Sequence, residues 1–306
     1  MKKKIIPLFL TALFIFMILN PNVILEGAKT GILLWFEAVL PSLLPYMIIS
    51  NLIIIAGLSK DMAFIMKPLT KLLGIKSDAA YCILAGVFFG YPSCAAAAVS
   101  MYREKQLDRD TACFVSCAFN NISPAFIAGY VCAGALNDSS KIVPVLILFY
   151  IILLLSTILI RIILFRRLPK NTVSSAFVRH TKESLLDSAV MSALTNIARL
   201  AGYIVIFSII AAVISLIPWR FTGVLCSVCE VTTGINIMCR SFADTKLLML
   251  MIIPMLSFGG ISGIFQTFGV DTERIIDRKK YIYSKIIAMT VSFACTYLAV
   301  YVFGII

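Results

Sequence analysis

Seven long apolar stretches constrain this chain more than any other feature. A helix needs about 20 apolar residues to cross a hydrocarbon core of about 30 Å. Hydrophobic residues make up 60% of the 306 residues and charged residues only 14%, which excludes an ordinary soluble domain. We therefore predict an all-α polytopic membrane protein with about seven spanning helices in one membrane domain. The stretches are residues 4–24, 31–57, 111–135, 142–165, 197–217, 247–270 and 281–304.

The first stretch follows Met1-Lys2-Lys3-Lys4, a start that a secretory signal peptide shares. The sequence "ILNPNVILEG" that ends it has no small-residue cleavage pattern, however. We therefore predict that residues 1–30 form an uncleaved N-terminal helix.

The basic residues predict how the chain lies in the membrane. The 27 Lys and Arg exceed the 15 Asp and Glu, for a net charge of +12. Basic residues of membrane proteins concentrate in cytoplasmic loops. With a cytoplasmic N-terminus, most of these 27 residues fall on the cytoplasmic side. The charge therefore indicates topology, and a nucleic-acid partner is not needed to explain it.

Residues 80–105 contain a break, Gly90-Tyr91-Pro92-Ser93, between two apolar arms that are each too short to span a membrane. Lysines and arginines precede and follow the segment, so both flanks are predicted to be cytoplasmic. This pattern predicts a re-entrant helical hairpin. Backbone that leaves a helix at membrane depth must face protein or a water-filled cavity. We expect the N–H groups of residues 93–95 to point into such a cavity, where a helix N-terminus attracts anionic or polar groups.

A second copy of this pattern occurs later in the chain. "FNNIS" at 119–123 and "FGGIS" at 258–262 are 139 residues apart, and the same offset places Tyr91 opposite Glu230. Residues 222–241 are then a second hairpin, which the topology places on the outer side.

The predicted directions of the two halves are opposite throughout, which is typical of inverted-repeat transporters with substrate bound at the repeat interface. We predict a first repeat at 31–170, a cytoplasmic connector at 171–196 and a second, inverted repeat at 197–306.

Polar residues near the two breaks are candidates for the substrate site. The paired asparagines offer amide groups, Pro124 predicts a local helix break beside them, and a Gly-Gly pair lets backbone approach a ligand. The alternative is that these groups only hydrogen-bond one helix to another. The candidate binding residues are Ser93, Asn120, Asn121, Ser123, Thr232, Thr233, Gly259, Gly260, Ser262 and Gln266.

Two acidic residues are candidates for coupling or gating. An ionisable residue at bilayer depth costs about 3 kcal/mol on insertion scales, so Glu230 is expected to be functional. It would bind a coupling proton or cation, or contact the ligand; the alternative is a hairpin-tip residue that reaches interfacial water. Glu37 lies closer to a helix entrance and has the same two interpretations.

Catalysis and metal binding find no support in the sequence. Cys226 and Cys229 form a C-x-x-C, but no second pair follows, and the one histidine is His180 in a predicted cytoplasmic loop. Neither a phosphate-binding Gly-rich loop nor a nucleophile set is present. We expect no enzyme activity and no cofactor apart from a coupling proton or cation.

Five motifs together resemble the YlbJ/SpoVV family of sporulation integral membrane proteins: "LPSLLPY", "FFGYPS", "FNNISPAFI", "CEVTTG" and "LSFGGISGIFQ". That family carries a nucleoside recognition or gate domain and is similar to concentrative nucleoside transporters, which suggests a homo-oligomer. The resemblance implies transport of dipicolinic acid from mother cell to forespore across the outer forespore membrane. Cys94 and the residues Gly263–Phe265 depart from the family pattern, and the second departure leaves the ligand open.

Other functions remain as alternatives. A nucleoside-type substrate is the second choice within the transporter class. A sporulation scaffold that keeps the fold without transport would depend on the 171–196 connector instead of on Asn121 and Glu230. An intramembrane enzyme or lipid-handling protein is last, for want of a nucleophile or metal set.

Overall fold

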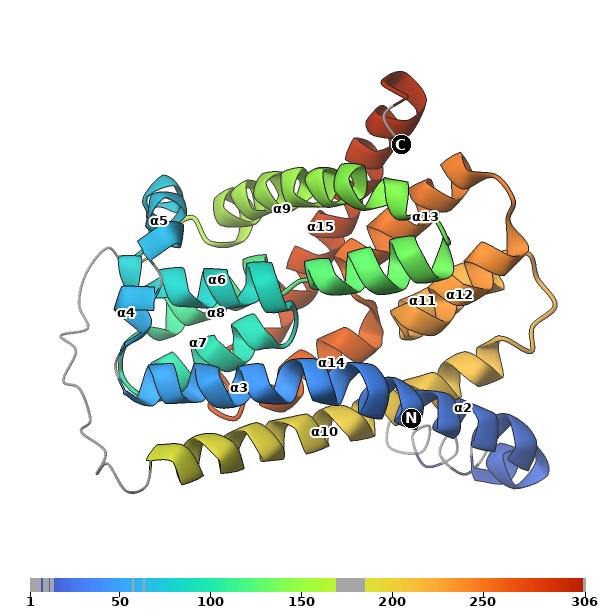
Figure 1. Cartoon of the computed structure of the whole chain (residues 1–306), viewed down its shortest axis with the longest axis horizontal. Helices are drawn as coiled ribbons and strands as arrows, with labels where there is room; N and C mark the ends of the chain where they lie inside the picture. The colour runs from blue at the N-terminus through green and yellow to red at the C-terminus, as the bar shows by residue number, and fades with distance from the viewer. Residues whose placement is uncertain are drawn as a thin grey trace.

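The computed structural model describes residues 14–56, 58–62, 64–168 and 185–304, together with Pro7 and Thr11. Every regular element in these residues is a helix (Figure 1). The predicted helix at 4–24 falls partly outside the described residues; within them, residues 14–19 are helical and a new helix begins at Pro21. Residues 171–184 of the predicted connector also lie outside.

Four helical segments in the described residues are long and apolar enough to cross a membrane. They are Ser139–Leu164, Leu185–Ile214, Thr245–Val270 and Arg278–Val302. Shorter apolar helices at Leu43–Ile55, Ser77–Phe89 and Phe126–Ala135 accompany them. This pattern is that of a multi-pass membrane protein. Of the seven spans expected, the one at 4–24 falls partly outside the described residues, and the one at 111–135 is interrupted at residues 120–123.

The helices form two outer sides with short helices between them. In Figure 1, α2, α3 and α10 lie along one side and α9 along the other. The pairs α6–α7 and α11–α12 lie between these sides, together with α8 and α14. The bounds are α2 (Pro21–Leu33), α3 (Leu40–Ile55), α4 (Ser59–Met62), α5 (Lys67–Leu73), α6 (Ala80–Phe89), α7 (Ser93–Arg103), α8 (Arg109–Phe119), α9 (Ile142–Leu164), α10 (Leu185–Ile214), α11 (Thr222–Cys229), α12 (Val231–Ser241), α13 (Thr245–Phe258), α14 (Gly260–Val270) and α15 (Arg278–Tyr297).

Two predicted spans are broken in the middle. The span expected at 111–135 ends as α8 at Phe119, and the chain is not helical again until Pro124. Proline disfavours the helical conformation of the residue before it, here Ser123. The span expected at 247–270 breaks at Gly259, which has a left-handed backbone with φ of 78°. We call residues 120–123 the first break and Gly259 the second break.

Two boundaries differ from the sequence expectation. Residues from Leu185 onward, inside the segment predicted as a connector, are already helical in α10, because Ala189, Ala193 and Ile197 continue its buried face for two further turns. The span expected at 31–57 begins already at Pro21: α2 runs into α3 through a π-helical turn, Leu34–Val39, without interruption.

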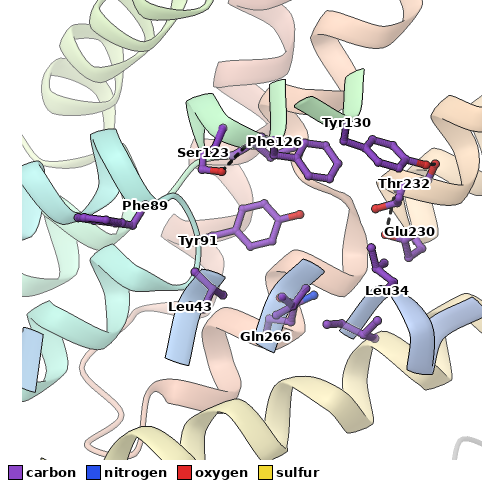
Figure 2. Close-up of a pocket in the computed structure, with 14 residues that line it drawn as sticks. Leu34, Leu43, Phe89, Tyr91, Ser123, Phe126, Tyr130, Glu230, Thr232 and Gln266 are labelled. Carbon is purple, nitrogen blue, oxygen red and sulfur yellow. Dashed lines mark hydrogen bonds between the residues drawn. The ribbon is translucent and has the colours of Figure 1, made fainter. Parts of the chain in front are cut away.

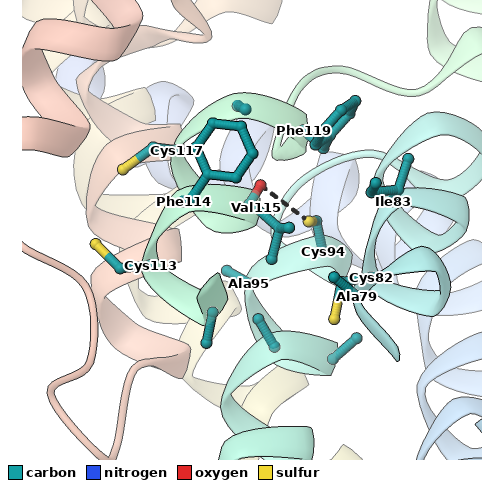
Figure 3. Packing of buried hydrophobic residues seen from close by; sticks show 14 of the residues in the cluster. Ala79, Cys82, Ile83, Cys94, Ala95, Cys113, Phe114, Val115, Cys117 and Phe119 are labelled. Atoms are coloured by element: carbon teal, nitrogen blue, oxygen red, sulfur yellow. Dashed lines mark hydrogen bonds between the residues drawn. The ribbon is translucent and has the colours of Figure 1, made fainter. Parts of the chain in front are cut away.

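The segment 80–105 forms two short helices, α6 and α7, that pack against each other and against α8. Small side chains fill this contact, since Ala85, Ala95 and Ala98 are fully buried, and the Cys94 thiol lies 3.4 Å from the Val115 carbonyl oxygen (Figure 3). Small residues permit close helix approach where the surrounding lipid gives no hydrophobic driving force.

Gly86 marks the tightest of these contacts. A Cβ atom there would lie 2.1 Å from the Phe119 carbonyl oxygen, which is backbone at the end of α8. We expect Gly86→Ala to lower the free energy of unfolding by about 1–3 kcal/mol, because overpacking displaces backbone. Thermal unfolding in detergent is the measurement. The matched control is Gly202→Ala in α10, where a Cβ atom would lie more than 4 Å from every heavy atom outside its own helix backbone. An equal effect of the two changes would contradict the packing described here.

Candidate functional site

Both helix breaks meet the turns of the two short helix pairs. The turn of the α6–α7 pair touches the first break: the Tyr91 N–H donates to the Asn121 carbonyl, and a Cβ at Gly90 would lie 2.5 Å from the Ser123 nitrogen. The turn of the α11–α12 pair touches the residue after the second break, since a Cβ at Gly260 would lie 3.2 Å from the Ser227 carbonyl oxygen. Each break is therefore covered by one turn.

Two tyrosines join the first break and its turn to the second break and its turn. The Tyr91 ring lies against the second break, 3.1 Å from a Cβ built at Gly263 and 3.4 Å from one at Gly259. The Tyr130 hydroxyl donates to the Thr232 carbonyl at 2.9 Å and so joins the helix after the first break to α12. The two breaks and the two turns are therefore joined to one another by these contacts.

A cavity of about 320 Å³ lies at this meeting point (Figure 2). Four aromatic rings contribute to its wall, and the Tyr91 hydroxyl points across it toward the side where Glu230 and Thr232 lie. Two lining segments are π-helical, Leu34–Val39 and Phe126–Ala135, a distortion common at functional sites. The lining residues are Leu34, Val39, Leu43, Phe89, Tyr91, Ile122, Ser123, Ala125, Phe126, Tyr130, Ile204, Glu230, Thr232 and Gln266.

Four residues predicted from the sequence line this cavity: Ser123, Glu230, Thr232 and Gln266. Gln266 is 7% exposed and donates from its amide to the Ser262 hydroxyl at 3.0 Å, so Ser262 positions it from outside the cavity. Tyr91 and Tyr130 were not among the sequence candidates. The sequence feature that could have identified them is their position beside the breaks: Tyr91 lies in the turn between α6 and α7, and Tyr130 follows Pro124 in the helix after the first break.

Ser123 and Glu230 also cap helices. The Ser123 hydroxyl accepts the Phe126 N–H at 3.2 Å. The two carboxyl oxygens of Glu230 accept the N–H groups of Thr232 at 3.1 Å and Thr233 at 2.7 Å. Glu230 is 5% exposed, so it is held at the N-terminus of α12 and does not extend into bulk water. An acidic group there is stabilised by the helix dipole.

The asparagine pair lies outside the cavity lining. The Asn120 amide donates to the Thr267 hydroxyl at 2.8 Å and to the Tyr281 hydroxyl at 3.1 Å, and its oxygen accepts the Ala95 N–H at 3.3 Å. The Asn121 amide donates to the Ala118 carbonyl at 3.0 Å. These bonds join α7, α8, α14 and α15, so the structural alternative describes Asn120 better than the ligand-binding prediction.

The N-terminus of α7 differs from the expectation that residues 93–95 offer free N–H groups. The Ser93 N–H donates to the Gly90 carbonyl at 2.9 Å, and the Ala95 N–H is taken by Asn120. The turn closes on itself because Gly90, with a φ of 76°, turns its carbonyl back toward Ser93. The Ser93 side chain is buried, and its hydroxyl has no partner within the described part of the chain.

The other sequence candidates are close to the cavity without lining it. Gly259 and Gly260 provide the backbone surface for Tyr91 and for the α11–α12 turn. Thr233 is half-buried one residue beyond Thr232. Glu37 is exposed on the π-helical turn whose end residues, Leu34 and Val39, do line the cavity.

Lys285 is a functional candidate that sequence reasoning missed. It is one of the 27 basic residues that the sequence analysis used only to predict topology, but it is 2% exposed in α15. Its ammonium donates to the Asn120 carbonyl and, at 3.0 Å, to the Asn121 side-chain oxygen. The sequence feature that could have identified it is the polar stripe of α15, in which Tyr281, Ser284 and Lys285 are buried at helical spacing.

Within residues 14–56, 58–62, 64–168 and 185–304, no three His, Cys, Asp or Glu side chains cluster as metal ligands do.

Asn120 and Gln266 should respond differently to truncation. Asn120→Ala strands the buried Ala95 N–H, so we expect it to lower the unfolding free energy by about 1–3 kcal/mol. Gln266→Ala removes one side-chain bond beside a cavity that water can enter and should cost less, about 1 kcal/mol or below. Thermal unfolding of both purified variants tests this order, and the reverse order would contradict the structural role of Asn120.

No model of a known protein family matches the chain, and no solved structure matches it. Over 142 residues the chain is 29% identical to the sporulation integral membrane protein YlbJ of Bacillus subtilis strain 168. The match covers 45% of this chain and 35% of the relative, so it spans about a third of the relative's length. The family resemblance inferred from the motifs is confirmed as a distant homology: this multi-pass membrane protein is similar to the sporulation integral membrane protein YlbJ.

Proposed function

We propose that this chain is a membrane carrier for a small planar heterocycle, bound in the cavity between the two helix breaks. The observation that carries the proposal is that the first break and both short-helix turns line one cavity of about 320 Å³, while the second break contacts the Tyr91 ring in its wall. A break in an apolar helix is unfavourable unless its freed backbone groups are satisfied. In this chain protein groups satisfy backbone at the first break, and a ligand site accounts for the gathering of three such interruptions around one cavity.

The arrangement of the two halves supports alternating access. Helices α8 and α13 end at Phe119 and Phe258, which the 139-residue offset places opposite each other. The turn at Tyr91 and the one at Glu230 correspond under the same offset. We take the chain to be an inverted repeat of 31–170 and 197–306, with α6–α7 and α11–α12 as re-entrant hairpins. Substrate sites of such carriers lie at the repeat interface.

The cavity wall fits a flat ring with a few polar atoms. Phe89, Tyr91, Phe126 and Tyr130 offer aromatic surfaces, and Ser123, Thr232 and Gln266 offer hydrogen bonds. Small-molecule sites are typically apolar cavities of about 300–1,000 Å³ with a few well-placed polar groups. The cavity lies near the lower end of that range, which favours a compact substrate.

Dipicolinic acid is the first candidate substrate. The relative is a sporulation protein, and the family resemblance implies transport of this compound during spore formation. The protein would then lie in the outer forespore membrane with a cytoplasmic N-terminus. A nucleoside-type substrate is the second candidate, and Glu230 favours it. Glu230 is the one charged residue among the described lining residues, and a carboxylate repels a dicarboxylate substrate.

Uptake into liposomes tests the proposal. Purified protein is reconstituted, and the initial rate of labelled dipicolinate uptake is measured with and without excess uridine. We expect saturable uptake that Gln266→Leu lowers about tenfold, because one lost hydrogen bond of about 1.4 kcal/mol corresponds to that factor. Thr290→Ala, at an exposed site on α15, is the control and should leave uptake unchanged. Inhibition by uridine would make the nucleoside class the better assignment, and no uptake of either compound by folded protein would favour the scaffold alternative.

Glu230→Gln separates the two substrate classes. The change removes the carboxylate charge from the cavity and keeps the side-chain size, and the glutamine amide retains one of the two hydrogen bonds that cap α12. We expect dipicolinate uptake to rise by several-fold and uridine uptake to stay level or fall. Parallel uptake assays at one pH measure both, and an unchanged ratio of the two rates would show that Glu230 does not select the substrate charge.

A further inference from the structure

A buried cation contacts the first break. Lys285 projects from α15 and donates to the Asn120 carbonyl oxygen and to the Asn121 side-chain oxygen. Its side chain is 2% exposed, and within the described part of the chain no carboxylate forms an ion pair with it. A buried cation without a carboxylate partner is costly, so the oxygens around it must compensate.

These oxygens are of the kind that binds an alkali metal cation. Helix α8 ends at Phe119, so carbonyls at its end lack intrahelical partners and carry the negative end of the helix dipole. Unwound backbone carbonyls and helix C-terminal ends coordinate Na⁺ in transporters with broken helices. The Asn120 carbonyl is one such backbone ligand, and the Asn121 side-chain oxygen adds a second oxygen; both accept hydrogen bonds from the Lys285 ammonium.

We infer that Lys285 is a built-in cation, whose ammonium occupies the place at the first break that a bound Na⁺ would otherwise take. The remaining neighbours agree with this role. The ammonium lies 5.3 Å from the centroid of the Tyr281 ring, which offers a cation–π contact. Among the described residues, the Cys94 and Cys117 thiols also interact with it, and thiols are mostly neutral at pH 7.

The built-in cation also stabilises the turn of α6–α7. Asn120 accepts the Ala95 N–H, and the Asn121 carbonyl accepts the Tyr91 N–H. The asparagines that bind Lys285 therefore also hold the turn that carries Tyr91 into the cavity. If the chain is the carrier proposed above, its transport should not depend on Na⁺. Only this consequence rests on the proposed function.

Sodium dependence of thermal unfolding tests the inference without any substrate, so its result stands apart from the uptake result. Wild-type protein should unfold at the same temperature in NaCl and in choline chloride. Lys285→Ala opens space beside the two oxygens, and we expect it to unfold at a lower temperature in choline and to regain about 5 °C or more in NaCl. Lys285→Met fills that space with an uncharged chain and should be destabilised equally in both salts.

Thr290→Ala in the same helix is the control, with no expected effect of Na⁺. A Lys285→Ala protein that Na⁺ does not stabilise, whether folded or not, would overturn the inference. A wild-type protein that Na⁺ stabilises would also overturn it, because the site would then bind the metal cation in the presence of Lys285. This wild-type measurement can overturn the inference even if neither Lys285 variant folds.

Discussion

The structure depends on satisfying the backbone where two apolar helices break. Each unpaired N–H or C=O group in an apolar environment destabilises the fold by roughly several kcal/mol. At the first break, Tyr91 and Lys285 supply donors to the carbonyls of Asn121 and Asn120. The turns of α6–α7 and α11–α12 pack on the breaks with almost no spare space, as Gly90 and Gly260 indicate. This requirement accounts for the positions of the α6–α7 and α11–α12 turns.

The polar residues near the breaks divide into two groups with different roles. Asn120 and Asn121 direct their side chains to protein partners and hold α7, α8 and α15 together. Gln266 and Thr232 reach the cavity wall, beside the aromatic rings that sequence reasoning had left out. Glu230 belongs to both groups, since it caps α12 and lines the cavity. Function and folding therefore share the same few residues here.

Charge is distributed unequally around this site. Lys285 lies behind the first break, and Glu230 lies in the cavity at the opposite turn. The two charges neutralise different helix ends: the cation faces the carbonyl end of α8 and the acid faces the N–H end of α12. Each charge therefore stabilises a helix terminus that the fold has placed away from water.

The sequence alone determined the membrane class, the turn at Gly90–Pro92, the break before Pro124 and the short pair at 222–241, because apolar length, glycine and proline act locally. It also indicated the distant homology through short motifs. Only the tertiary structure decided which side chains meet. Asn120 and Lys285 are 165 residues apart, and local pattern does not specify a contact over that distance. The same holds for Tyr91 against Gly263, and for the early start of α10, whose alanine face became visible only through its packing partners α2 and α3.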